Sequence, residues 1–294
     1  MKTGFKIAII ALLVLAAIAF SGHYIATHSI PVLQPKGLIG IKERNLLLTC
    51  TVLMLIVVVP VLILAYLFAW KYREKNKHAK YSPDFEHNDI AEMCWWGVPI
   101  IIIAIISIIT WKSSHELNPF KPLVSEEKPV QVQVVALDWK WLFIYPEYKI
   151  AVVNYLEVPE QTPINFEITA DAPMNSFWIP DLGGMIMAMP GMRSKLYLQA
   201  SSKGMYVGRS AQISGKGFSG MFFDTHVTSK QGFEEWIKKN KKTNKVLTLD
   251  AYNDLVKPSD YHPVEIFEIG DVNLFDLIID KYLKPNHKLK EPED

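Results

Sequence analysis

Cysteine is nearly absent from this chain. The 294 residues include only two, Cys50 and Cys94, and both lie in long apolar runs. Two cysteines cannot build a disulfide scaffold or a four-cysteine zinc site. Because neither thiol belongs to the polar part of the chain, a copper site made of one cysteine and two histidines is excluded there. No GxSxG, Walker or GxGxxG motif stands between a strand and a helix, so hydrolase and nucleotide-binding functions have no support.

Net charge is also close to zero, at +1 with 21% charged residues, which gives no basis for nucleic-acid binding. A hydrophobic content of 50% argues against a disordered chain. The charges are unevenly distributed, because residues 1–111 carry ten Lys or Arg and six Asp or Glu between long uncharged stretches, whereas residues 112–294 carry 21 and 24. We therefore predict a membrane region in the first third and a water-soluble region in the rest.

Two runs lack charge altogether, over residues 46–70 and 93–111. Each is long enough to cross a hydrocarbon core of about 30 Å as a helix. Pro60 and Pro99 lie inside these runs, and membrane helices tolerate proline where neighbouring helices satisfy the freed carbonyl. The alternative is a soluble protein in which both segments are buried core helices.

The loop between the two runs, residues 71–92, sets the expected orientation. Five basic residues fall within ten positions of it: Lys71, Arg73, Lys75, Lys77 and Lys80. Positive loops stay in the cytoplasm, so the chain after residue 111 is expected outside. Residues 1–21 form either a cleaved signal peptide or an uncleaved signal anchor, followed by an exported segment at 22–45. His23 stands where a lipid-bearing cysteine would be needed, which excludes lipidation there.

Beyond residue 111 the hydrophobic period changes from that of a helix to that of a strand. Residues 129–136 (PVQVQVVA) and 163–170 (PINFEITA) alternate apolar and polar positions, as half-buried strands do. Further strand-like segments occur at 139–146, 148–159, 193–200 and 204–214. About eight short strands predict a β-sandwich or Greek-key barrel over residues 112–226. Residues 227–294 are predicted to form a helical extension with a charged tail.

The order of these parts resembles subunit 2 of the heme-copper respiratory oxidases. Three segments carry the resemblance. DWKWLFIYPE at 138–147 is similar to the family's aromatic segment, MNSFWIPDLGG at 174–184 to its first metal-loop segment, and GRSAQISGKGFSGM at 208–221 to its second. The resemblance implies a membrane α-helical hairpin and an all-β, cupredoxin-like Greek-key sandwich with a helical C-terminal extension.

The chain departs from the copper-binding members of that family at the ligands. In the cytochrome c oxidases, the second segment holds two cysteines, a carboxylate, a histidine and a methionine, and the first holds another histidine. Here the methionine remains as Met221, while the other positions carry Asn175, Ser210, Gln212, Ser214 and Phe218. Serine hydroxyls are poor ligands for soft metals, so a binuclear copper centre is not expected. The same loss is typical of the ubiquinol oxidases of the cytochrome bo type.

Similarity to that group implies a subunit with no cofactor of its own in a proton-pumping oxidase that passes electrons from ubiquinol to oxygen. Hemes and copper are then expected in the partner subunit 1. The expected partners are subunit 1, other oxidase subunits, membrane lipid and, through the complex, ubiquinol. The expected location is the bacterial inner membrane, with two spans and the C-terminal domain in the periplasm. A free-standing, membrane-anchored cupredoxin-like protein that binds copper or a metallochaperone is the alternative.

Several residues allow two interpretations. Met185, Met187, Met189 and Met192 suggest a thioether copper site, but alternate methionines on a strand are more often core or interface filler. Trp139 and Trp141 would be electron-entry aromatics in the cytochrome c branch of the family, but without copper they are expected to pack the domain. His226 has no nearby cysteine or second histidine and is expected at the surface or in a hydrogen bond.

Glu92 lies at the expected cytoplasmic start of the second span, immediately before the charge-free run at 93–111. A carboxyl at a membrane edge is a functional hypothesis by default. The family resemblance implies a role for Glu92 at the mouth of a proton channel that continues in subunit 1. The competing interpretation is a glutamate that only reaches toward the lipid headgroups.

Overall fold

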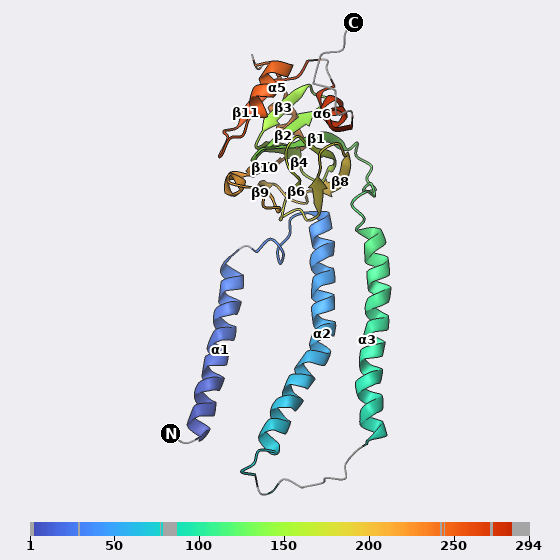
Figure 1. The fold of residues 1–294 in the computed structure, drawn as a ribbon, viewed down its shortest axis with the longest axis vertical. Helices are drawn as coiled ribbons and strands as arrows, with labels where there is room; N and C mark the ends of the chain where they lie inside the picture. Colours follow the sequence, from blue (N-terminus) through green and yellow to red (C-terminus); the bar gives the residue numbers. More distant parts are fainter. Residues whose placement is uncertain are drawn as a thin grey trace. The chain divides into compact units, whose positions relative to one another are not determined.

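The computed structural model describes residues 3–28, 30–76, 78, 87–241, 243, 245–270 and 273–283 (Figure 1). The chain divides into two compact units. One consists of residues 1–41 together with 119–294, and the other of residues 42–118. Lys77, Lys80 and the charged tail after residue 283 lie outside the described residues.

Three long helices form the apolar part of the chain: α1 (Thr3–Thr27), α2 (Leu38–Lys71) and α3 (Asp89–Glu116). The two predicted runs lie inside α2 and α3, which extend beyond them at both ends. Helices α2 and α3 are long and apolar enough to cross a membrane, and no residue in the most apolar 18-residue stretch of either helix is buried. The alternative of two buried core helices is therefore wrong.

The polar part of the chain is a sandwich of two sheets. The six-stranded sheet contains, in spatial order, β11 (Glu265–Glu268), β3 (Ile150–Val153), β2 (Lys140–Tyr145), β1 (Val130–Leu137), β5 (Pro163–Ala170) and β8 (Ser194–Gln199). The five-stranded sheet contains β4 (Tyr155–Pro159), β10 (Phe222–Thr228), β9 (Gly204–Ser210), β6 (Asn175–Trp178) and β7 (Met185–Ala188). Pairing is parallel between β1 and β5 and between β4 and β10, and antiparallel elsewhere within these sheets.

Aromatic rings fill the space between the two sheets. The ring centroids of Trp141 and Phe143 on β2 lie 5.4 and 4.8 Å from those of Phe177 and Phe223, respectively. Phe177 also stacks on Phe223 at 5.4 Å. All four side chains are fully buried. Large rings brought together from both sheets make this the main core of the domain.

Strand β1 shows why the alternation in the sequence fades toward its end. Its first residues alternate buried and half-buried, but the last four are all buried. Val135 and Leu137 point away from the inter-sheet core and pack in a second apolar cluster with Tyr252 and Phe275. The C-terminal extension therefore covers the outer face of the six-stranded sheet.

That extension contains α4 (Lys230–Asn240), α5 (Leu249–Leu255) and α6 (Leu274–Leu283), as predicted, together with a strand that was not predicted. Strand β11 pairs antiparallel with β3, from Glu265↔Val153 to Glu268↔Ile150. The expectation of a purely helical extension is corrected to this extent. The short EIFE segment gave no strand signal because its alternation extends over only four residues.

The segment at 148–159 also differs from the prediction of one strand. It forms β3 and β4, which belong to different sheets. The chain changes sheets at Asn154, whose φ is +55°. Asparagine tolerates this left-handed conformation better than most residues. Its side-chain Oδ1 accepts a hydrogen bond from the N–H of Trp141 at 2.8 Å, which fixes the corner.

Candidate functional site

The two segments that resemble metal loops meet at one end of the five-stranded sheet. The first contains β6, and the second runs from Ser210, at the end of β9, to Met221 before β10; we call residues 210–221 the second loop. Ser210 Oγ donates to Oδ1 of Asn175 at 3.0 Å. It accepts from the main-chain N–H groups of Ser176 and Gln212 at 3.4 and 3.3 Å. Asn175, Ser176 and Ser210 are buried, so these groups satisfy one another away from water.

The remaining positions form a second group nearby. Ser214 Oγ lies 3.9 Å from Met221 Sδ, and the carbonyl of Ser214 accepts from Trp139 Nε1 at 3.0 Å. Phe218 begins a short 3₁₀ turn (Phe218–Gly220). Met221 is buried, whereas Ser214 and Phe218 are half-buried. The fold thus brings Asn175, Ser210 and Gln212 into one hydrogen-bonded set and leaves Ser214 and Met221 in another.

These side chains do not fit a copper ion. They offer hydroxyls, amides, one phenyl ring and one thioether, whereas soft copper sites require thiolate, imidazole or several thioethers. The hydroxyl of Ser210 is already engaged with Asn175. Across the described part of the chain, no three His, Cys, Asp or Glu side chains are grouped so that they could hold a metal ion.

A cavity of about 470 Å³ opens beside the second loop. Its walls come from β9, β10 and the loop itself: Val207, Arg209, Ser210, Phe218, Ser219, Met221, Phe222 and Asp224. Apolar side chains form one part of the wall, and Arg209 and Asp224 contribute opposite charges. The cavity could accept an apolar group with a small polar head, but its geometry offers no catalytic pair.

The other residues singled out from the sequence have distinct places. Trp141 is fully buried in the main core, and Trp139 is half-buried against the second loop. His226 is partly exposed, and its Nδ1 lies 3.0 Å from both carboxylate oxygens of Glu157. The prediction of a hydrogen-bonded His226 is confirmed.

The methionines are not core residues, which corrects one part of their interpretation. Met185, on β7, is 49% exposed, and Met192 is 51% exposed. Met187 is half-buried, and its sulfur accepts a hydrogen bond from Ser176 Oγ at 3.1 Å. Among the described residues, no cluster of three or more His, Cys, Asp or Glu side chains that could hold a metal ion lies beside these methionines.

Glu92 lies in the first turn of α3. The helix starts after the N-cap Asn88, whose Oδ1 accepts from the N–H of Ala91 at 2.9 Å. Glu92 Oε2 is 3.3 Å from Nδ1 of His87, and its side chain is 44% exposed. A carboxylate in this position interacts favourably with the positive end of the helix dipole. The Glu92 carboxylate therefore stabilises the start of α3, whether or not it also takes part in function.

Besides Glu157, two further buried charged residues were missed by the sequence analysis. Lys140, between two tryptophans in WKW, is 1% exposed and donates to two main-chain carbonyls. The carboxylate of Asp171 accepts from Tyr252, Lys281 and Tyr282, at 2.8, 2.6 and 2.6 Å. A charged residue inside an otherwise apolar strand was the available signal for Lys140. Nothing local pointed to Asp171, because all three of its partners lie more than 80 positions away.

Two family descriptions match parts of the chain. Residues 146–227 match "Cytochrome C oxidase subunit II, periplasmic domain", and residues 241–286 match "COX Aromatic Rich Motif". The second match covers β11, the edge strand of the six-stranded sheet, and the helices α5 and α6, which cover the outer face of that sheet.

Curated relatives match over most of the chain. The cytochrome bo(3) ubiquinol oxidase subunit 2 of Pseudomonas aeruginosa is 51% identical over 249 residues, covering 85% of this chain and 75% of that protein. The ubiquinol oxidase subunit 2 of Acetobacter aceti is 47% identical, covering 89% and 86%. The cytochrome bo(3) ubiquinol oxidase subunit 2 of Buchnera aphidicola subsp. Schizaphis graminum is 42% identical, covering 95% and 96%.

Among solved structures, the periplasmic domain of subunit II of cytochrome oxidase from Bradyrhizobium japonicum is similar. The identity is 21% and the TM-score is 0.39, over 41% of this chain and 98% of that one. A likeness of this degree carries no functional argument.

Proposed function

The chain belongs to the ubiquinol oxidase subunit 2 family, and on this premise we propose that it is the non-redox, membrane-anchored subunit of a proton-pumping terminal oxidase. The complex would couple ubiquinol oxidation to the reduction of oxygen to water. Subunit 1 would carry the hemes and the copper, and this chain would scaffold it. The complex would lie in the bacterial inner membrane, with the sandwich in the periplasm.

The observation that carries the non-redox role is the hydrogen-bonded set at Asn175 and Ser210. A hydroxyl and an amide at 3.0 Å satisfy each other in a buried site, where copper ligands would need soft or imidazole donors. A quinol oxidase takes its electrons from a substrate dissolved in the membrane. Such a complex therefore does not need a copper centre on its outer side to receive electrons from a soluble donor.

Purification of the intact complex tests this proposal. The full chain carrying a C-terminal affinity tag should copurify, in mild detergent, with a large multi-span subunit, heme absorbance and ubiquinol oxidase activity. The preparation should show no thiolate-to-copper absorption band. Isolation of the tagged chain alone, without heme, would instead favour the free-standing binding protein.

We propose further that Glu92 helps to load protons at the cytoplasmic mouth of a channel in subunit 1. Its place at the start of α3 and its 44% exposed side chain, which lets it exchange protons with bulk water, support this role. Glu92→Gln should slow ubiquinol-driven oxygen reduction several-fold at normal heme content, because the amide cannot carry the proton. Glu92→Asp should retain more activity than Glu92→Gln.

Asp89→Asn is the matched control. Asp89 lies in the same helical turn and contacts the same His87, and its side chain is 86% exposed. If turnover falls equally in Glu92→Gln and Asp89→Asn, loss of charge at the helix start explains both, and the proton role is wrong. Normal turnover in Glu92→Gln would also contradict it.

A further inference from the structure

The second loop is packed directly against the C-terminal extension. We call residues 255–262, which connect α5 to the segment before β11, the extension loop. Gly217 and Gly220 allow the contact, because a Cβ at Gly217 would lie 2.2 Å from Asp260 Oδ1, and one at Gly220 would lie 3.0 Å from the main-chain N of Tyr261. The ring of Tyr261 also lies edge-on to Phe222, with centroids 6.3 Å apart. The two loops are therefore in van der Waals contact.

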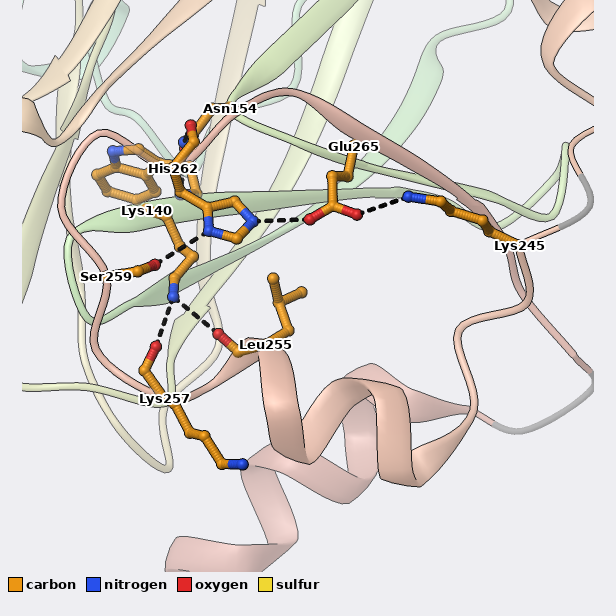
Figure 2. A network of polar contacts seen from close by, with 9 residues as sticks. Lys140, Asn154, Lys245, Leu255, Lys257, Ser259, His262 and Glu265 are labelled. Carbon is orange, nitrogen blue, oxygen red and sulfur yellow. Dashed lines mark hydrogen bonds and ion pairs between the residues drawn. The ribbon is translucent and has the colours of Figure 1, made fainter.

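Side chains of the sandwich hold the extension loop at both of its ends. At its start, Lys140 Nζ donates to the carbonyls of Leu255 and Lys257, at 2.8 and 2.7 Å (Figure 2). At its end, Asn154 Nδ2 donates to the carbonyl of His262 at 2.8 Å. Figure 2 shows the two bonds from Lys140 to the carbonyls of Leu255 and Lys257, with Asn154 and His262 labelled in the same view.

Lys140 is an unusual residue for this task. It is 1% exposed, and burial lowers the pKa of its ammonium group. Its two acceptors lie where α5 ends, and carbonyls there have no partner within the helix. Without these acceptors, the buried ammonium group would be removed from water with no hydrogen bonds to offset the unfavourable free energy of desolvation. The two hydrogen bonds therefore define one position of the extension loop relative to β2.

Trp139, the residue before Lys140, contacts the second loop. Trp139 has a φ of +63° in the turn between β1 and β2, and its Nε1 donates to the carbonyl of Ser214 at 3.0 Å. A Cβ added at Gly217 would lie 2.4 Å from the Trp139 ring, so this close contact requires glycine. Two consecutive residues, Trp139 in the turn and Lys140 at the start of β2, thus contact the second loop and the extension loop, respectively.

We propose that the C-terminal extension sets the conformation of the second loop, with Lys140 as the positioning residue that links them. Lys140 fixes the extension loop, Tyr261 and Asp260 of that loop support Gly217 and Gly220, and the supported loop shapes the cavity beside β9 and β10. Ser219 and Phe222 line that cavity and both contact Tyr261. This inference depends on contacts within the chain, so it stands or falls separately from the function of the complex.

Hydrogen exchange in the purified, full-length complex tests the proposal. The amides of Phe218, Gly220 and Met221 are hydrogen-bonded inside the second loop, at 3.0–3.2 Å, and report its conformation. Lys140→Met keeps an unbranched apolar stem and removes the donors. It should speed exchange about tenfold or more in residues 210–221 as well as in 255–262, while β5 and β8 remain protected. Lys140→Arg, which keeps a charged donor, should show a smaller effect.

Tyr261→Ala provides a second measurement if Lys140→Met fails to assemble. Tyr261 is 64% exposed, so its truncation leaves the core intact. It should speed exchange in 210–221 but not in 255–262, because Lys140 still holds the extension loop. Lys257→Gln is the control, since its exposed side chain pairs with Asp254 and its carbonyl remains available to Lys140. Unchanged exchange in 210–221 for both Lys140→Met and Tyr261→Ala would overturn the proposal.

Discussion

At the scale of single residues, the second loop shows how buried polar side chains can satisfy one another without water or a ligand. Ser210, Asn175 and the main chain of Gln212 form a closed set, so the site requires no ligand to be satisfied. Buried hydrogen bonds of this kind contribute modestly when made and cost more when one partner is removed. Removing the Ser210 hydroxyl should therefore lower the stability of the domain by a measurable amount.

Ser210→Ala should destabilise the domain by about 1–3 kcal/mol, because it leaves the Asn175 amide oxygen and the Ser176 N–H without their buried partner. For a domain of this size, the shift in Tm should be about 2–4 °C per kcal/mol, measured by scanning fluorimetry. Ser219→Ala is the control, because Ser219 is exposed and its hydroxyl lies 3.4 Å from Tyr261. Equal shifts for both variants would contradict the importance of the buried set.

Glu265 makes the stability of the folded domain depend on pH in the acidic range. Its hydrogen bond from Lys245 at 2.9 Å, and a second from His262 at 3.0 Å, lower the pKa of the carboxyl below its ordinary value of 4.5. The pKa is lower in the folded state, so the stabilisation is present above pH 4.5 and is lost as the pH falls through the folded value. Lys245→Gln should therefore lower Tm at pH 6 but not near pH 3. A constant difference across that range would contradict this assignment.

At the scale of elements, the start of α2 is attached to the sandwich by main-chain bonds. The N–H groups of Lys36 and Gly37 donate to the carbonyl of Asp181, and that of Gly40 donates to Leu182, at 2.6, 3.1 and 3.0 Å. Gly37 also forms an isolated bridge with Ala200. The close approach requires glycine, since a Cβ at Gly37 would lie 2.3 Å from the Leu182 carbonyl oxygen.

Gly37→Ala should therefore separate the start of α2 from the loop at 181–184. The backbone atoms of Leu182 cannot move aside as a flexible side chain would, so amide exchange at residues 36–40 should be at least about tenfold faster than in the natural chain. Gly270→Ala is the control, because no heavy atom lies within 4 Å of the added Cβ. If the two variants exchange at the same rate over 36–40, the attachment is weaker than these contacts indicate.

At the scale of the whole molecule, the arrangement of charge predicts the orientation in the membrane. Basic residues follow α2, while the chain after α3 carries slightly more acidic than basic residues. Fusions of a reporter after Lys80 should report the cytoplasm, and fusions after Pro129 should report the periplasm. Replacing the basic residues of the 71–80 segment by glutamine should weaken this preference. The reverse pattern in the natural chain would contradict the exported sandwich.

The sequence determined those features that depend on neighbouring residues. Long charge-free runs predicted α2 and α3, because a membrane span requires only length and apolarity. Period-two alternation predicted β1 and β5, and the positions of the two loop segments followed from local motifs. The lack of a thiol outside the apolar runs also followed directly from the sequence. Strands β6 and β11 were missed, since four residues carry too little alternation. Strand β10 was missed because Thr225 occupies one of its buried positions and interrupts the apolar alternation.

Only the tertiary structure decided which distant groups meet. Ser210 is 35 residues from Asn175, and Lys140 is 115 and 117 residues from the two carbonyls that it holds. No local pattern specifies such pairs, because each is selected by the packing of whole sheets and by the need to satisfy buried polar groups. A single lysine in an apolar strand looks unfavourable by itself. It is compatible with the core here because the C-terminal extension supplies its acceptors from the far end of the chain.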